Sequence, residues 1–319
     1  MKRRIILSSL LVVGGLSIAI AAQQQQQPKT LEVTKLKDNL YVLKALTNGG
    51  GGNTSVFITA NGVVVVDSKN PGWGQPILDK IKTLTDKPVT TLINTHTHGD
   101  HVSGNVEFPA NVDIIVQANT AENMKKMIPN STAADQTVPT ETIFQKNGNR
   151  GLAKRTFKDK MTLGKGADEV DLFYFGRGHT NGDAFVLFPA ARVLHAADIF
   201  SGKNIPLLDA NNGGSAVEIG NSLEKAANSL NGKYDTIITG HSSEMTPADL
   251  REYIAFNREF VSDVQAGMKA GKSIDDVANN WKIPAKYNGY APITTPADKV
   301  RVKNNVTLAY KEIGSKGTK

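Results

Sequence analysis

Short apolar runs separated by turn residues dominate the first three quarters of the chain. Their β-branched and aromatic residues are typical of strands that are buried on one or both faces. They predict strands at residues 40–43, 54–59, 63–66, 89–94, 171–175, 184–188, 192–197 and 236–239. Between the second and third runs, Asn61-Gly62 is a strong hairpin signal. The third run is entirely apolar and is followed by a charged residue, Asp67.

Longer segments with helical spacing lie between and after these runs. They predict helices at residues 75–85, 120–128, 215–230, 246–270, from 273 onward and 295–314. Asn119 or Thr120 would cap the second helix, a capping box at Ser215–Glu218 would open the third, and Gly314 would close the last. The polar segment 129–160, interrupted by Pro and Gly, is expected to form a loop near the site. Such an order of elements favours a layered α/β fold with helices outside.

The N-terminus has the pattern of an export signal. Lys2-Arg3-Arg4 precedes an apolar stretch that ends with the small-residue pattern Ala19-Ile20-Ala21. We therefore predict a signal peptide at 1–22 and a periplasmic or secreted protein. Gly14-Gly15 interrupts the apolar stretch, so we expect no stable membrane insertion after signal removal. The glutamine tract that follows predicts a flexible linker at 23–30.

Composition narrows the chemistry further. The chain of 319 residues has a formal net charge of +7, and part of this charge lies in the predicted signal peptide. The remaining positive charge is small, so we expect no nucleic-acid partner. It contains no cysteine, so an exported protein of this sequence has no disulfides and depends on core packing and metal. We expect a small-molecule substrate.

The most informative segment is His96-Thr97-His98-Gly99-Asp100-His101, which follows a predicted strand. Imidazole and carboxylate are the ligands that zinc prefers when cysteine is absent. If the strand continues, His96 and His98 point to the same side, and Gly99 then allows a sharp turn. Four candidate ligands are too many for one tetrahedral ion that keeps a position open. The spacing therefore predicts two metals side by side.

Three further candidates each follow a predicted strand. They are His179, Asp198 and His241. Taken singly, each would more often be an ordinary polar loop residue, and Asp198 in particular occupies a common turn position. Together they lie where loops converge at the carboxyl ends of strands, which is typical of a site built on a rigid sheet.

The ordered set resembles the metallo-β-lactamase-fold hydrolase superfamily, from about Leu31 to about Met245. This resemblance implies an αββα four-layer sandwich, here with extra C-terminal helices, and a metal site at one edge. It implies a first zinc ion bound by His96, His98 and His179, and a second bound by Asp100, His101 and His241, with Asp198 bridging both. It also implies a catalytic domain at 31–245 and a helical segment at 246–319 packed on it.

The resemblance also implies roles for residues near the ligands. Asp67 matches an aspartate that supports the backbone of the metal loop. His195 matches no ligand position and is expected to pack or to donate a hydrogen bond, while Asp183 is expected to order the loop of His179.

Two zinc ions 3.5–4 Å apart lower the pKa of a shared water to roughly 7. We therefore expect a binuclear hydrolase in which a metal-bound hydroxide attacks a carbonyl of an ester, lactone, thioester or amide, with Asp100 orienting the nucleophile or moving its proton. Iron or manganese in place of zinc stays open. The expected substrate loops are 48–53, 129–160 and 201–214, and the candidate substrate contacts are Lys203, Asn211 and Asn212.

Two alternatives remain. One is a metallo-β-lactamase that hydrolyses β-lactam antibiotics, although those enzymes usually carry cysteine or serine at the position of Asp198. The other is a non-catalytic exported metal-binding protein, against which the complete set of candidate ligands argues.

Overall fold

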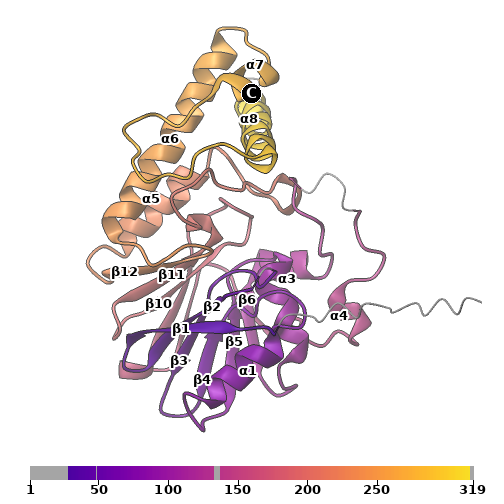
Figure 1. The fold of residues 1–319 in the computed structure, drawn as a ribbon, viewed down its shortest axis with the longest axis vertical. Coiled ribbons are helices and arrows are strands. Elements are labelled where there is room, and N and C mark those ends of the chain that lie inside the picture. Colours follow the sequence, from indigo (N-terminus) through magenta and orange to yellow (C-terminus); the bar gives the residue numbers. More distant parts are fainter. Residues whose placement is uncertain (1–27, 48, 133–136, 317–319) are drawn as a thin grey trace, which may run out of the picture.

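The computed structural model describes residues 28–47, 49–132 and 137–316. The predicted signal peptide at 1–22 and most of the predicted linker lie outside these residues. Two mixed β-sheets pack face to face, with helices on their outer sides (Figure 1). The predicted four-layer αββα sandwich with additional C-terminal helices is confirmed.

The larger sheet has seven strands in sequential order. They are β1 (Leu31–Lys37), β2 (Leu40–Ala45), β3 (Thr54–Ile58), β4 (Val63–Val66), β5 (Val89–Asn94), β6 (Asp113–Gln117) and β7 (Arg155–Phe157). Strands β1 to β4 pair antiparallel, and β4 to β7 pair parallel. The carboxyl ends of β4 and β5 therefore meet at one edge of the sheet.

The smaller sheet has five strands, in the order β12-β11-β10-β9-β8. They are β8 (Lys160–Leu163), β9 (Val170–Tyr174), β10 (Ala184–Phe188), β11 (Val193–Ala197) and β12 (Thr236–Thr239). Only β11 and β12 pair parallel, so their carboxyl ends lie side by side.

The apolar run of β4 shows how the sequence builds the layers. All four valines of β4 are buried. Val64 and Val66 face the core between the sheets, whereas Val63 and Val65 face the core under α1 (Gly74–Lys82). Because side chains alternate along a strand, a strand buried on both faces has no polar position.

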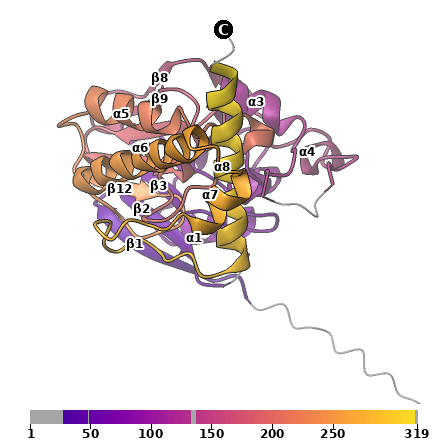
Figure 2. The same cartoon turned by 90° about the horizontal axis from the view of Figure 1, so that it is seen from above.

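Helices from the C-terminal part of the chain cover the smaller sheet. They are α5 (Ile219–Ser229), α6 (Pro247–Lys269), α7 (Ile274–Asn280) and α8 (Pro296–Lys316). Their apolar side chains share a core with β10, β11 and β12, and Figure 2 shows α6 and α8 lying across this side of the molecule. Capping boxes at Thr246 and Ser273 begin α6 and α7 as the sequence predicts. None of the described helices is long and apolar enough to cross a membrane.

Several local predictions are wrong. The helix predicted at 120–128 is α3 (Ala118–Met124), which Gln117 caps. Ser215 caps a turn before α5, which begins only at Ile219, and α8 continues past Gly314.

The segment 129–160 is not a simple loop, because it contains α4 (Ile143–Lys146) and the edge strand β7, and its last residue begins β8. Strands β1 and β6 were also not expected from the sequence. The β7 segment has three residues of mixed polarity, so pairing with β6 rather than its own pattern makes it a strand.

Candidate metal centre

Four strand ends bring the seven candidate ligands together. The metal loop follows β5, the short helix α2 (Gly99–Val102) begins directly after His98, and the other candidates follow β9, β11 and β12. Ligand atoms of His96, His98, His179 and Asp198 form one group, and those of Asp100, His101 and His241 form a second. Atoms within each group lie within 4.8 Å of one another.

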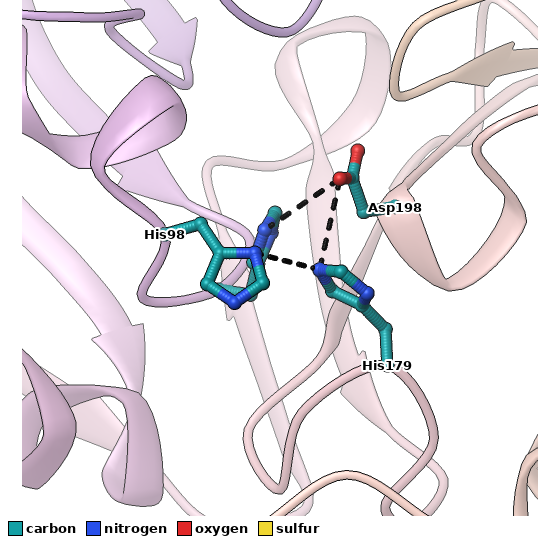
Figure 3. A group of neighbouring side chains, drawn as sticks. His98, His179 and Asp198 are labelled. Carbon is teal, nitrogen blue, oxygen red and sulfur yellow. Dashed lines mark hydrogen bonds and ion pairs between the residues drawn. The ribbon is translucent and has the colours of Figure 1, made fainter. Parts of the chain in front are cut away.

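In the first group two imidazoles point toward one oxygen of Asp198, and the third, that of His98, contacts His179 (Figure 3). Nδ1 of His98 lies 2.9 Å from Nε2 of His179. Oδ2 of Asp198 lies 3.6 Å from Nε2 of His179 and 4.0 Å from Nε2 of His96. All three imidazoles therefore present a nitrogen to the same small volume.

The second group lies on the other side of Asp198. Oδ1 of Asp198 is 3.3 Å from Nε2 of His101 and 3.2 Å from Nε2 of His241. Oδ2 of Asp100 is 3.3 Å from Nε2 of His241. Asp198 therefore lies between the two groups, with Oδ2 toward the first and Oδ1 toward the second.

Asp67 fixes the loop that carries the first two histidines. Its buried carboxylate accepts hydrogen bonds from the backbone N–H of Thr95 at 2.8 Å, from the Thr95 hydroxyl at 2.7 Å and from Nδ1 of His101 at 2.7 Å. The bond from Nδ1 directs Nε2 of His101 into the cluster. These contacts agree with the role expected for Asp67.

Two other contacts orient His98 and His179. Nε2 of His98 lies 2.7 Å from Oδ2 of the buried Asp209, and Nδ1 of His179 lies 2.6 Å from the carbonyl oxygen of Leu207. The sequence analysis missed Asp209. Its side chain also accepts from the backbone of Asn211 and Asn212, and this Asp-x-Asn-Asn turn pattern was the available signal.

Asp183 and His195 are placed as expected. Asp183 accepts from the backbone N–H and the hydroxyl of Thr180, next to His179. Burial raises the pKa of Asp183 to about 7, although its bonds with Thr180 oppose the shift. His195 is fully buried, and its Nδ1 lies 2.7 Å from the Ser55 hydroxyl.

The glycine run after β2 touches the cluster directly. A Cβ at Gly52 would lie 2.2 Å from Cε1 of His101, and a Cβ at Gly240 would lie 1.8 Å from Oδ1 of Asp198. These positions need glycine because neighbouring side chains of the cluster approach the backbone closely. Lys69, fully buried, donates to the carbonyl of Gly52, and burial lowers the pKa of this lysine to about 7.

The donor chemistry fits metal ions. The single hydroxyl proton of Thr95 goes to Asp67, so Nδ1 of His96 must donate to Thr95, at 3.0 Å. Nε2 of His96 then carries a lone pair, is buried and has no hydrogen-bond partner among the described residues. A buried lone pair without a donor is costly unless a cation receives it. Imidazole and carboxylate donors suit zinc.

Two histidines of the first group, His96 and His179, have lowered pKa values. Burial, followed by the neighbouring imidazoles of His101 and His179, lowers the pKa of His96 well below its ordinary value. Burial and the nearby His98 lower the pKa of His179 to about 4. Imidazoles with such values are neutral at pH 7, which is the form that binds a metal.

The second group behaves in the opposite way. Asp198 has the largest influence on His241 and raises its pKa to about 9. Burial works against the charged form of His101, but Asp198, Asp100 and Asp67 outweigh it and raise the pKa of His101 well above its ordinary value. Burial also works against the charged form of Asp198, but His241 and His101 outweigh it and hold the pKa of this carboxyl well below its usual range.

The three candidate substrate contacts from loop 201–214 have other partners. Lys203 pairs with Asp249 at 2.8 Å and Glu252 at 3.1 Å on α6. Asn211 donates to the carbonyl of Pro129, and Asn212 donates to the carbonyl of Ile128. These side chains therefore hold the loop to its neighbours.

A His/Asp cluster at strand ends between two sheets is the kind of site that defines binuclear metallohydrolases. The family model described as the metallo-beta-lactamase superfamily matches residues 47–241. The chain belongs to this superfamily, and the match ends at the last residue of the cluster.

The similar proteins have differing activities. The chain is 31% identical over 180 residues to a metallo-beta-lactamase type 2 of Elizabethkingia meningoseptica, covering 53% of this chain and 62% of that protein. It is 28% identical over 145 residues to a hydroxyacylglutathione hydrolase of Synechocystis sp., covering 46% of each. The chain thus spans less than two thirds of the length of these relatives.

A solved structure confirms the fold. The metallo-beta-lactamase from Pontibacter korlensis superposes with a TM-score of 0.56 at 19% identity, covering 72% of this chain and 99% of that one. A substantial part of the chain lies outside the common fold.

Proposed function

We propose that the protein is a di-zinc hydrolase that cleaves a carbonyl compound, namely an ester, lactone, thioester or amide. The observation that carries this proposal is the position of Asp198, whose two carboxylate oxygens face different groups of ligand atoms. His96, His98 and His179 would hold one zinc ion, Asp100, His101 and His241 the other, and Asp198 both.

Paired zinc ions, when bound, supply an activated water near neutral pH and a Lewis acid for the carbonyl oxygen. The protein supplies access and proton handling. His98, Asp100, His179, Asp198 and His241 line a cavity of about 380 Å³, so a small molecule can reach the cluster. Within it, Oδ2 of Asp100 lies beside Nε2 of His241, and this position supports a role in which Asp100 would orient the attacking water and receive its proton.

Metal analysis combined with a substrate panel tests this proposal. We expect about two zinc ions per chain in the native protein, and turnover of at least one aryl ester, lactone or thioester. Iron or manganese in the native protein would change the metal assignment. The Asp86→Asn variant serves as a control for aspartate variants of the cluster, because it removes an exposed aspartate that lies away from it. Protein without bound metal, or with bound zinc and no turnover across the panel, would contradict the proposal, and the second outcome would favour a non-catalytic metal-binding protein.

A second candidate function is hydrolysis of β-lactams. The similarity to the metallo-beta-lactamase of Elizabethkingia meningoseptica favours it. The aspartate at position 198, where such enzymes usually carry cysteine or serine, argues for a different main substrate. Nitrocefin hydrolysis much faster than that of every ester and lactone would reverse this order.

We also propose the division of the chain into a signal peptide at 1–22, a linker at 23–30, a catalytic domain at 31–245 and a C-terminal helical segment at 246–319. The range of the family match supports the catalytic part. The charged and apolar pattern at the N-terminus supports export to the periplasm or beyond. N-terminal sequencing of the mature protein tests the cleavage.

A further inference from the structure

The cavity over the metal cluster has a wall that comes from the C-terminal helices. Arg301 of α8 lines it together with Ser201, Asn204 and Leu207. Residue 301 lies beyond the range of the family match, which ends at 241. Among the described residues of this cavity, Arg301 is the only lysine or arginine, so it supplies the one fixed positive charge of the protein there.

The guanidinium of Arg301 has unused hydrogen-bonding capacity. Nη1 donates to the carbonyl oxygen of Ile205 at 3.2 Å, which uses one of five N–H groups. Within the described part of the chain, no carboxylate lies within the 4.0 Å of an ion pair with Arg301. The neighbouring Asp298 instead accepts hydrogen bonds from Thr294 and Thr295.

Two other side chains of α8 also bind the segment that Arg301 touches. Asn304 and Asn305 donate to the carbonyls of Leu208 and Pro206, both at 2.8 Å. Residues 205–208 are therefore held against α8 by more than the bond from Arg301. Arg301 is half-buried and lines the cavity, so its remaining N–H groups are available to a ligand there.

The other side of the cluster carries no cationic side chain of this kind. A second cavity of about 340 Å³ shares His98, Asp100 and Asn130 with the first. Its wall mixes apolar residues such as Met127 and Ile143 with hydroxyl-bearing residues such as Thr142, and among the described residues no lysine or arginine lines it. The fixed positive charge therefore lies only on the α8 side of the cluster.

Resting on the proposed hydrolase function, we propose that Arg301 binds a carboxylate of the substrate, so that the substrate is a carbonyl compound with an anionic group on the α8 side of the scissile bond. Arginine binds carboxylates through two parallel hydrogen bonds, which gives orientation as well as affinity. Arg301 is therefore a specificity-determining residue of the cavity.

A matched pair of esters tests the assignment in the zinc-loaded protein. Mono-para-nitrophenyl adipate carries a terminal carboxylate, and para-nitrophenyl hexanoate is its neutral counterpart. For Arg301→Met we expect kcat/KM on the adipate ester to fall about 10- to 100-fold, mainly through KM, because a hydrogen bond to a charged group is lost. The hexanoate ester should change by less than about twofold, and Arg301→Lys should be intermediate.

Asn304→Ala is the matched control on α8, because it removes a bond to residues 205–208 and leaves the charge of the cavity unchanged. It should affect both esters equally. If Arg301→Met also affects both esters equally, Arg301 has only a structural role and the inference is wrong.

Binding separates this inference from the proposed function. The ether analogue omega-(para-nitrophenoxy)hexanoate cannot be hydrolysed, and its Kd can be measured by calorimetry. If neither ester is cleaved, the hydrolase proposal fails for esters, but a Kd about tenfold weaker in Arg301→Met would still support the carboxylate site. An unchanged Kd would overturn it.

Discussion

The two halves of the His/Asp cluster share Asp198 but differ in burial and in charge. Histidines of the first group are almost fully buried, and the pKa of His179 is lowered to about 4. In the second group, the side chain of His241 is 40% exposed, and its pKa is raised to about 9. At pH 7, His179 in the first half is thus neutral, whereas His241 in the second half is protonated.

The difference follows from the number of carboxylates that each half faces. In the first group His96 and His179 face one oxygen of Asp198 and His98 faces Asp209, so a proton on His96 or His179 would lie beside other imidazoles in a medium of low polarity. In the second group Asp100, Asp198 and Asp67 surround His101, so without a metal these carboxylates favour the protonated imidazole. The first half is therefore organised to receive a metal without releasing protons, whereas the second must release them.

Removing the shared carboxylate is expected to have the largest effect, because it damages both halves. In Asp198→Ala we expect zinc content to fall below one ion per chain and kcat/KM to fall on the order of 1000-fold or more. Metal analysis and ester turnover measure the two effects. Unchanged zinc content in this variant would mean that Asp198 does not lie between two ions.

Single histidine variants are expected to separate the halves. His98→Ala should remove the metal of the first group, whereas His241→Ala should leave that metal in place and lose only the second. Both should reduce turnover roughly 100- to 1000-fold, with about one zinc ion retained per chain. Equal zinc affinity of the remaining site in both variants would contradict the difference between the halves.

Asp209 should affect the first half through His98. In Asp209→Asn the oxygen that accepts from the surrounding backbone can be kept, but Oδ2 beside Nε2 of His98 is replaced by an amide nitrogen. We expect zinc binding at the first group to weaken about 10- to 100-fold, as is typical for the partner of a metal-binding histidine. Competition with a chromogenic chelator measures this affinity, and Asn304→Ala is the control with an intact Asp209.

In the metal-free protein, stability should fall on both sides of neutral pH for different reasons. The pKa of the buried His195 is lowered by burial to about 4, so it stays neutral in the folded state while the unfolded chain takes up a proton. Its contribution is lost as the pH falls from about 6.5 to 4, and amounts to roughly 3 kcal/mol. The raised pKa of His241 gives the opposite sign, since its contribution is present below about 6.5 and is lost as the pH rises through 9.

Chemical denaturation between pH 4.5 and 9 measures the free energy of unfolding on both sides of neutral pH, that is, the acid limb and the alkaline limb of its pH dependence. His195→Gln should flatten the acid limb only, and His241→Gln the alkaline limb only. An acid limb that is unchanged in His195→Gln would show that other groups cause it.

The sequence alone determined the ligand types and the elements that carry them. The cluster at 96–101 could be predicted from the sequence because its residues are adjacent. The expected continuation of the strand is wrong, since β5 ends at Asn94 and residues 95–97 form bends, and His98 is extended just before the turn at Gly99. The strands before His179, Asp198 and His241 could also be predicted, because these short segments are rich in β-branched and apolar residues.

Only the tertiary structure decided how these residues meet. Three features depend on contacts between residues far apart in the chain. They are the direction of each oxygen of Asp198, the bond between His98 and Asp209, and the position of Arg301 in the wall of the cavity. Edge strand β7 is a further case, because it is a strand through its pairing with β6 and not through its own sequence pattern. The types of ligand residues can be predicted from neighbouring residues in the sequence. The direction of a side chain across the site is set instead by packing between distant elements.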